Sequence, residues 1–448
     1  MMNSHISKIN LNKHFTIIYL AAFFIFCSVF VLKILPSFLV FAIYVFGVLY
    51  FSVKIFSKKN AFFYFLTIAI FFTSFLSFEI DIVTIPLLNI SFNGLLLLPI
   101  ISLTIAGIFL KFKGIFPLSF VEKLNIFYFM LFLIPFIYGK GSPSILIMFY
   151  IYLFFFLFLM LFVKRQNVEI NKLLLYILYS ITLINIISLI IHYTGFNVNF
   201  SDEFGLETSR MFALWGSLNS NRFSVLLGVA VIINIHLMKL NRRGILFVNL
   251  LLLILSLILT YSRMGILATI FIVILYYIFL KRISLRKLFS IGIFLSILYF
   301  LSNILIKYFQ RGNDLGVETL SSRDIIWIEI VNSLLNDIPH TIIGYGVTNN
   351  PILNNLVIPV SHAHNGYLEI VVETGLIGLF IYLIINLKTM KLYWKAASKD
   401  KTFLVLFSIT LLFMIGNLTE SLTVGPYNSS MLIHQFCIVA AANYAVKF

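Results

Sequence analysis

Residues 222–282 carry three long apolar runs separated by short polar stretches: RFSVLLGVAVIINIHLMKLNRRGILFVNLLLLILSLILTYSRMGILATIFIVILYYIFLKR. The runs cover 222–238, 245–261 and 264–280. Each reaches the length of roughly 17 residues at which an apolar helix can cross a bilayer. Transmembrane β-strands alternate apolar and polar side chains, which these runs do not. The segment therefore predicts three consecutive membrane-spanning helices.

The same pattern continues over the rest of the chain. Of the 448 residues, 61% are hydrophobic and 11% are charged, whereas a soluble domain carries about 25% charged residues. The sequence therefore predicts an all-α fold, a polytopic transmembrane helical bundle with 12–14 spans. The fourteen candidate spans lie near 16–34, 37–53, 61–78, 95–110, 124–138, 144–163, 173–193, 222–238, 245–261, 264–280, 288–306, 366–387, 402–416 and 430–446.

Basic residues alternate between the predicted loops. If the N-terminus is cytoplasmic, every second loop is basic, and these loops with the two chain ends hold 24 of the 32 Lys and Arg residues. Cytoplasmic loops of membrane proteins carry such an excess, so this orientation is predicted. The same pattern accounts for the net charge of +16, and no nucleic-acid partner is expected. The basic loops are 54–59, 111–123, 164–172, 239–243, 281–287 and 388–401.

Two outer segments, 194–221 and 307–365, are longer than simple connectors. Loops of such length usually fold or carry function, so 307–365 is predicted to be one large periplasmic loop containing short helices. The chain then divides into four parts. They are N-terminal transmembrane spans (1–193), spans with the first periplasmic Arg motif and a Ser-Arg hairpin (194–306), the large periplasmic loop (307–365) and C-terminal spans (366–448).

One short helix is predicted near the start of the large loop. Ser321 and Asp324 have the spacing of a capping box. Arg323 would lie in the first helical turn, and apolar residues follow at the spacing of a helix with one buried face. The residues expected on that face are Ile326, Ile330, Val331 and Leu334.

Three predicted outer segments bring Arg and His residues to the same side of the membrane. The first precedes the span at 222–238, the second is the tight hairpin at 261–265, and the third is the large loop, which ends in a His-Ala-His-Asn sequence. The candidate site residues in these segments are Arg210, Asn221, Arg222, Arg263, Arg323, Trp327, His362, His364, Asn365 and Glu369.

Some of these residues also have an interpretation without function. Arg263 lies at the membrane boundary, where an arginine binds lipid phosphates, serves a site, or simply extends to the interface. A helix dipole does not explain Arg323 at a helix start, since acids are favoured there, but a surface salt bridge would. The spacing of His362 and His364 does not suggest zinc, and no metal or cofactor is predicted.

Several arginines at the outer lipid boundary suit a diphosphate. Guanidinium groups pair phosphate oxygens bidentately and keep their charge. A nearby histidine titrates near neutral pH and can take a proton from a hydroxyl. Together they indicate glycosyl transfer from a polyprenyl-diphosphate sugar, in which arginines would stabilise charge on the leaving diphosphate.

The large loop and the span after it resemble a known family. The stretch from Ser322-Arg323 to Trp327, then Gly344-Tyr345-Gly346, and then His364-Asn365-Gly366-Tyr367-Leu368-Glu369 to Glu373-Thr374-Gly375-Leu376-Ile377-Gly378 resembles the core of the O-antigen ligase and O-antigen polymerase superfamily. Tyr261-Ser262-Arg263 and the segment from Arg210 to Asn221 resemble its upstream motifs. The resemblance covers about residues 205–385.

The resemblance implies a metal-independent glycosyltransferase of the bacterial inner membrane. The donor would be a glycan on undecaprenyl diphosphate, presented on the periplasmic face. By this resemblance Arg210, Arg263 and Arg323 would hold the diphosphate or the neighbouring sugar, and His364 would act on the acceptor hydroxyl or orient the donor. Asn365 and Glu369 would support them. A polysaccharide chain-length regulator is a possible partner.

Three alternatives stay open beside an O-antigen polymerase. A ligase would transfer the glycan to the lipid A core instead of another lipid-linked repeat unit. A transporter or flippase would move the lipid-linked sugar, but such proteins usually carry ionisable residues near the bilayer midplane. A membrane scaffold would use the large loop only for contacts. The concentration of charge on one face favours chemistry at the interface.

Overall fold

The computed structural model describes a little under half of the chain. The described residues are 84–85, 90–91, 118–131, 156, 170–194, 220–240, 244–280, 323–346, 351–354, 356, 363–422 and 429–443. They are helical apart from turns and one antiparallel pair of two-residue strands, β1 (Thr84–Ile85) and β2 (Ile90–Ser91). The predicted all-α fold is confirmed. The predicted spans at 16–34, 37–53, 61–78, 95–110 and 288–306 lie outside the described residues, and so does 144–163 apart from Phe156.

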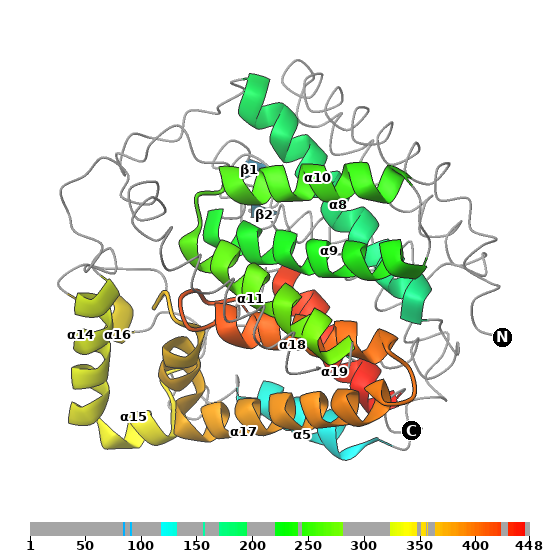
Figure 1. Ribbon diagram of the computed structural model, residues 1–448. Coiled ribbons are helices and arrows are strands. Elements are labelled where there is room, and N and C mark those ends of the chain that lie inside the picture. Colours follow the sequence, from blue (N-terminus) through cyan, green and yellow to red (C-terminus); the bar gives the residue numbers. More distant parts are fainter. Residues whose placement is uncertain are drawn as a thin grey trace.

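Four described helices are long and apolar enough to cross a membrane. They are residues Ile170–Ile190 within α8 (Ile170–Thr194), α9 (Ser220–Leu240), α11 (Arg263–Leu280) and α17 (Gly366–Ala397). Three shorter apolar helices accompany them: α10 (Gly244–Leu259), α18 (Thr402–Gly416) and α19 (Ser429–Asn443). The chain is therefore an integral membrane protein with several spans (Figure 1).

Helix α9 lies at the centre of the described bundle. It packs against α8, α10, α11 and α18, and most of its side chains are buried. Helix α11, in contrast, leaves Leu267, Phe271 and Tyr277 about half exposed. In a membrane protein such apolar side chains face lipid, so α9 is the interior helix and α11 has one lipid-facing side.

Polar side chains join the buried helices. The amide nitrogen of Asn249 on α10 donates to Thr182 Oγ1 on α8 at 3.2 Å and to Asn234 Oδ1 on α9 at 3.1 Å. All three residues are fully buried. Without water to serve these groups, such interhelical hydrogen bonds fix neighbouring spans against one another.

The remaining helices are α5 (Phe120–Met130), which packs against α17, and three short helices before α17. The short helices are α14 (Arg323–Asn336), α15 (Ile338–Ile343) and α16 (Pro351–Asn354). In Figure 1 they lie at one end of the bundle, beyond the ends of α9 and α10. Helices α14 and α16 form a small apolar core with the first two turns of α17.

The predicted helix after Arg323 is present, with one correction to its buried face. Ile326, Ile330 and Leu334 are buried as expected, but Val331 is 40% exposed. The first three residues are four apart and lie in one row along the helix. Val331 is turned about 100° from Ile330, out of that row.

Helix α17 bends at Gly375, whose φ is +70°. The bend leaves backbone carbonyls without their helical partners, and the loop after α15 supplies donors. Tyr345 N–H donates to Val372 O at 2.8 Å, and Gly346 N–H donates to Glu373 O at 2.9 Å. These two hydrogen bonds form a joint that holds the short-helix layer (α14, α15 and α16) against α17. The candidate site lies at the start of α17.

Candidate functional site

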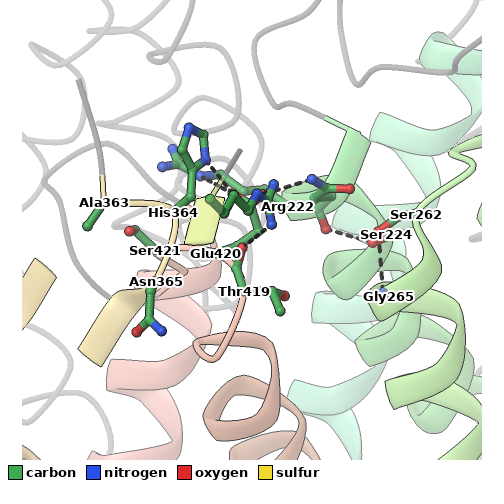
Figure 2. Close-up of polar contacts among 12 residues, drawn as sticks. Arg222, Ser224, Ser262, Gly265, Ala363, His364, Asn365, Thr419, Glu420 and Ser421 are labelled. Atoms are coloured by element: carbon green, nitrogen blue, oxygen red, sulfur yellow. Dashed lines mark hydrogen bonds and ion pairs between the residues drawn. The ribbon is translucent and has the colours of Figure 1, made fainter. Parts of the chain in front are cut away.

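A buried carboxylate, Glu420, gathers several of the predicted site residues (Figure 2). Its side chain is 2% exposed. Arg323 Nη2 and Asn221 Nδ2 each lie 2.8 Å from Glu420 Oε1. Arg222 Nε and His364 Nδ1 each lie 3.9 Å from Oε2. The site is therefore a compact cluster of cationic and polar groups around one acid.

Four segments far apart in the sequence build this cluster. Asn221 and Arg222 lie in the first turn of α9, and Arg323 is the first residue of α14. His364 lies two residues before α17, and Glu420 lies in the turn after α18. Since α9, α17 and α18 belong to the membrane bundle, the cluster lies where the bundle meets the short-helix layer.

The surrounding cations keep Glu420 ionised. Burial raises the pKa of this carboxyl, but His364, Arg323 and Arg222 lower it further than burial raises it, so that the pKa is about 2. A buried carboxylate is stable only when paired and hydrogen-bonded, and here both conditions hold. Among the cluster's described side chains, two guanidinium groups face this one carboxylate.

Arg323 is held by two acceptors. Besides the contact with Glu420, its Nη1 donates to the backbone carbonyl of Thr419 at 2.7 Å. The side chain is 19% exposed. A guanidinium carries five N–H donors in a rigid plane, so these contacts orient the group and leave donors for a further anion.

His364 has an unusual backbone conformation. Its φ is +49°, in the left-handed region that non-glycine residues rarely adopt, and its side chain is 32% exposed. The next residue, Asn365, begins α17 by accepting hydrogen bonds from Tyr367 N–H and Leu368 N–H. Strained backbone of this kind gathers at functional sites because the surroundings must hold it in place.

The turn that carries Glu420 is fastened to the start of α17. Gly366 N–H donates to Asn417 O at 2.7 Å, and Asn365 Nδ2 donates to Leu418 O at 3.1 Å. A Cβ at Gly366 would approach Asn417 to 2.7 Å, so this contact needs a glycine. His364 and Glu420 are thereby placed by one shared set of contacts.

Two of the candidate site residues, Glu369 and Trp327, hold the peptide before His364. Glu369 Oε2 accepts hydrogen bonds from Ala363 N–H at 2.7 Å and from Ser421 Oγ at 2.8 Å. Trp327 Nε1 donates to Ala363 O at 2.9 Å. Both polar groups of Ala363 are therefore bound, and this limits the freedom of the neighbouring histidine.

Arg263 begins α11 at the same end of the bundle. The hairpin before it is tight: Tyr261 has φ of +50°, and Ser262 Oγ accepts from Gly265 N–H at 3.3 Å. A Cβ at Gly265 would approach Ser224 Oγ to 1.8 Å, so the first turns of α11 and α9 are in contact. Ser224 in turn donates to Asn221 O at 2.6 Å (Figure 2).

The structure thus brings Asn221, Arg222, Arg323 and His364 together, with Arg263 near the same end. Arg210 and His362 lie outside the described residues. Glu420 is the site residue that the sequence reasoning missed. The sequence did offer a hint. Glu420 lies between the predicted spans 402–416 and 430–446, in a loop on the same side of the membrane as the candidate arginines, and an acid there could pair with them. In the described parts of the chain no three His, Cys, Asp or Glu residues form a group that could hold a metal ion.

A comparison with protein families finds a match to part of the chain. Residues 248–383 match the family described as O-antigen ligase (Wzy_C), and no curated protein matches the chain. The matched segment includes Arg263, Arg323, His364 and Glu369, whereas Arg222 and Glu420 lie outside it. Members of this family are glycosyltransferase-like ligases and polymerases of lipopolysaccharide biosynthesis. The match therefore supports membership of the O-antigen polymerase and ligase superfamily.

Proposed function

We propose that the chain is an O-antigen or related surface-polysaccharide polymerase. It would transfer an undecaprenyl-diphosphate-linked oligosaccharide onto another lipid-linked repeat unit at the periplasmic face of the bacterial inner membrane. The observation that carries this proposal is the convergence of Arg222, Arg323 and His364 on ionised Glu420 at one end of a membrane bundle.

The arginines suit the leaving group of this reaction. Glycosyl transfer breaks the bond between the anomeric carbon and a diphosphate oxygen, and negative charge grows on the diphosphate. Arg323 is fixed by Glu420 and the Thr419 carbonyl, so its remaining donors are preorganised for an anion. Arg263 begins α11 at the same end and is proposed as a second contact with the diphosphate or the adjacent sugar.

His364 is proposed to accept the proton of the acceptor hydroxyl. As the acceptor oxygen bonds to the anomeric carbon, that proton would pass to Nε2 of the neutral ring. The imidazolium so formed lies close to Glu420 through Nδ1, at 3.9 Å. A neighbouring carboxylate that stays ionised stabilises this positive charge, as in other histidine–carboxylate pairs.

A ligase is the second candidate, because the matched family is described as O-antigen ligase. It would use the same donor and the same cluster, with the lipid A core as acceptor. The polymerase is preferred because the richness in Phe, Ile, Asn and Lys resembles proteins of surface-polysaccharide clusters. The family match gives the flippase alternative no support.

A lipopolysaccharide gel on a deletion strain tests the proposal. For a polymerase, the deletion strain shows one repeat unit on the core, and wild-type protein restores the ladder while Arg323→Ala at equal membrane levels does not. Bare core with lipid-linked polymer accumulating would instead establish a ligase. An unchanged ladder in the deletion strain would contradict both activities in O-antigen synthesis.

A further inference from the structure

An open pocket of about 500 Å³ lies at the opposite end of α9 from Glu420. The last two turns of α9 contribute Ile235, Met238 and Lys239, the first residues of α10 contribute Gly244 and Phe247, and the end of α11 contributes Tyr277. Arg222 and Lys239 are 17 residues apart on α9, so the pocket lies about 25 Å from the candidate site. It is therefore a separate feature of the bundle.

The walls of this pocket continue onto lipid-facing surface. Phe247 and Tyr277 line it and are 53% and 49% exposed. One turn along α10 from Phe247, Leu251 is also about half exposed. Exposed apolar side chains on such helices contact hydrocarbon, so the pocket is a recess that an acyl chain can enter from the bilayer.

The pocket carries a positive charge, which lies at the end of α9. Lys239 is the charged residue among the described residues that line the pocket. The hydroxyl of Tyr276, another lining residue, is engaged with His236 Nδ1 at 2.9 Å and is not offered to the pocket. An apolar recess with an ammonium group at its interfacial end matches an anionic lipid, whose headgroup would pair with Lys239.

We infer that this pocket binds one phospholipid with an anionic headgroup in the leaflet opposite the candidate site. The acyl chain would lie between Phe247 and Tyr277, and the phosphate would meet Lys239. By the predicted orientation this is the cytoplasmic leaflet, where basic loops gather. The inference does not depend on the proposed glycosyl transfer.

Gly244 offers a direct way to test the recess. A Cβ built on this glycine meets nothing within 4 Å, so the first carbon of a larger side chain has open space. Because Gly244 lines the pocket, Gly244→Phe is expected to place its ring there, and Lys239→Gln removes the positive charge. Lys391→Gln is the matched control, because Lys391 is an exposed lysine near the end of α17 that does not line the pocket.

The measurement is native mass spectrometry of the delipidated full chain, titrated with phosphatidylglycerol or phosphatidylcholine of identical acyl chains. Wild type and Lys391→Gln should bind phosphatidylglycerol about fivefold more tightly than phosphatidylcholine, and Lys239→Gln should lose that preference. Gly244→Phe should lose the tightly bound lipid while keeping its lipid-free unfolding temperature. Equal binding of the two lipids by wild type, or unchanged binding by folded Gly244→Phe, would overturn the inference.

Discussion

Glu420 sets the arrangement of the cationic side chains in the candidate site. It accepts from Arg323 and Asn221 and lies near Arg222 and His364, all within a site of low exposure. Removing one member of a buried ion pair leaves the others uncompensated, which typically costs about 3–5 kcal/mol. In the proposed mechanism the acid therefore acts by positioning the cations and by its charge.

Glu420→Gln should lower both stability and transfer. The amide retains the shape but not the charge, so Arg323 loses its ion pair and an imidazolium at His364 loses its stabilising neighbour. Transfer should fall at least a hundredfold, whereas Glu420→Asp should recover part of it. Rates of lipid-linked glycan elongation, with unfolding temperatures measured in the same detergent, check this. Wild-type elongation by a folded Glu420→Gln protein would show that the acid is not needed.

The stabilising effect of Glu420 should depend on pH in a defined direction. Its pKa is about 2 in the folded protein against an ordinary value of 4.5, so the unfolded chain binds the proton more readily between these values. Stability from this group is complete above pH 4.5 and is lost as the pH falls toward 2. The difference in unfolding temperature between wild type and Glu420→Gln should shrink over that window. A difference that stays constant from pH 7 to pH 2.5 would contradict the assigned pairing.

At the scale of elements, the bend in α17 decides where the short helices lie. Gly375 has φ of +70°, and a Cβ there would approach the carbonyl oxygen of Ile342 to 2.1 Å. Gly344, with φ of +84°, packs equally closely on the backbone of Glu373. Gly375 and Gly344 thus allow the backbone of α17 to contact the backbone at the end of α15. This contact fixes α14, which carries Arg323, relative to α17.

Gly375→Ala should weaken this joint. A left-handed backbone costs a non-glycine residue about 1–3 kcal/mol, and the added methyl group also meets the backbone of α15. The variant should show a lower unfolding temperature and reduced transfer. Gly244→Ala is the control, because its Cβ meets open space, and it should behave as wild type. Equal stability of the two variants would mean that the joint does not constrain the fold.

The sequence predicted the helical, polytopic fold because long apolar runs have few alternatives. It also predicted the hairpin at Arg263 and the start of α14 at Arg323, both of which are local patterns. It missed Glu420, because the pairing of that acid depends on the turn after α18 reaching the start of α17. It placed Val331 on the buried face, since apolar character alone does not say which row of a helix is covered.

For the whole molecule, the alternation of basic loops predicts opposite sides for the two ends of the bundle. Asn336 on α14 and Lys391 near the end of α17 are both exposed and belong to opposite ends. The chain has two cysteines, Cys27 and the buried Cys437, so Cys27 is first replaced by serine. In that background, Asn336→Cys should react with an impermeant maleimide in spheroplasts. Lys391→Cys should react only after the membrane is opened. The reverse pattern would place the candidate site in the cytoplasm and contradict the proposed donor.

The central claim is that the cluster around Glu420 carries out glycosyl transfer from a lipid diphosphate. The most direct measurement uses purified protein in lipid nanodiscs with undecaprenyl-diphosphate-linked repeat units, and follows glycan length by gel and mass spectrometry. Wild type should extend the glycan without added lipid A core. His364→Ala and Arg323→Ala should fail while keeping the wild-type unfolding profile within a few degrees. Extension by both variants at the wild-type rate would contradict the account.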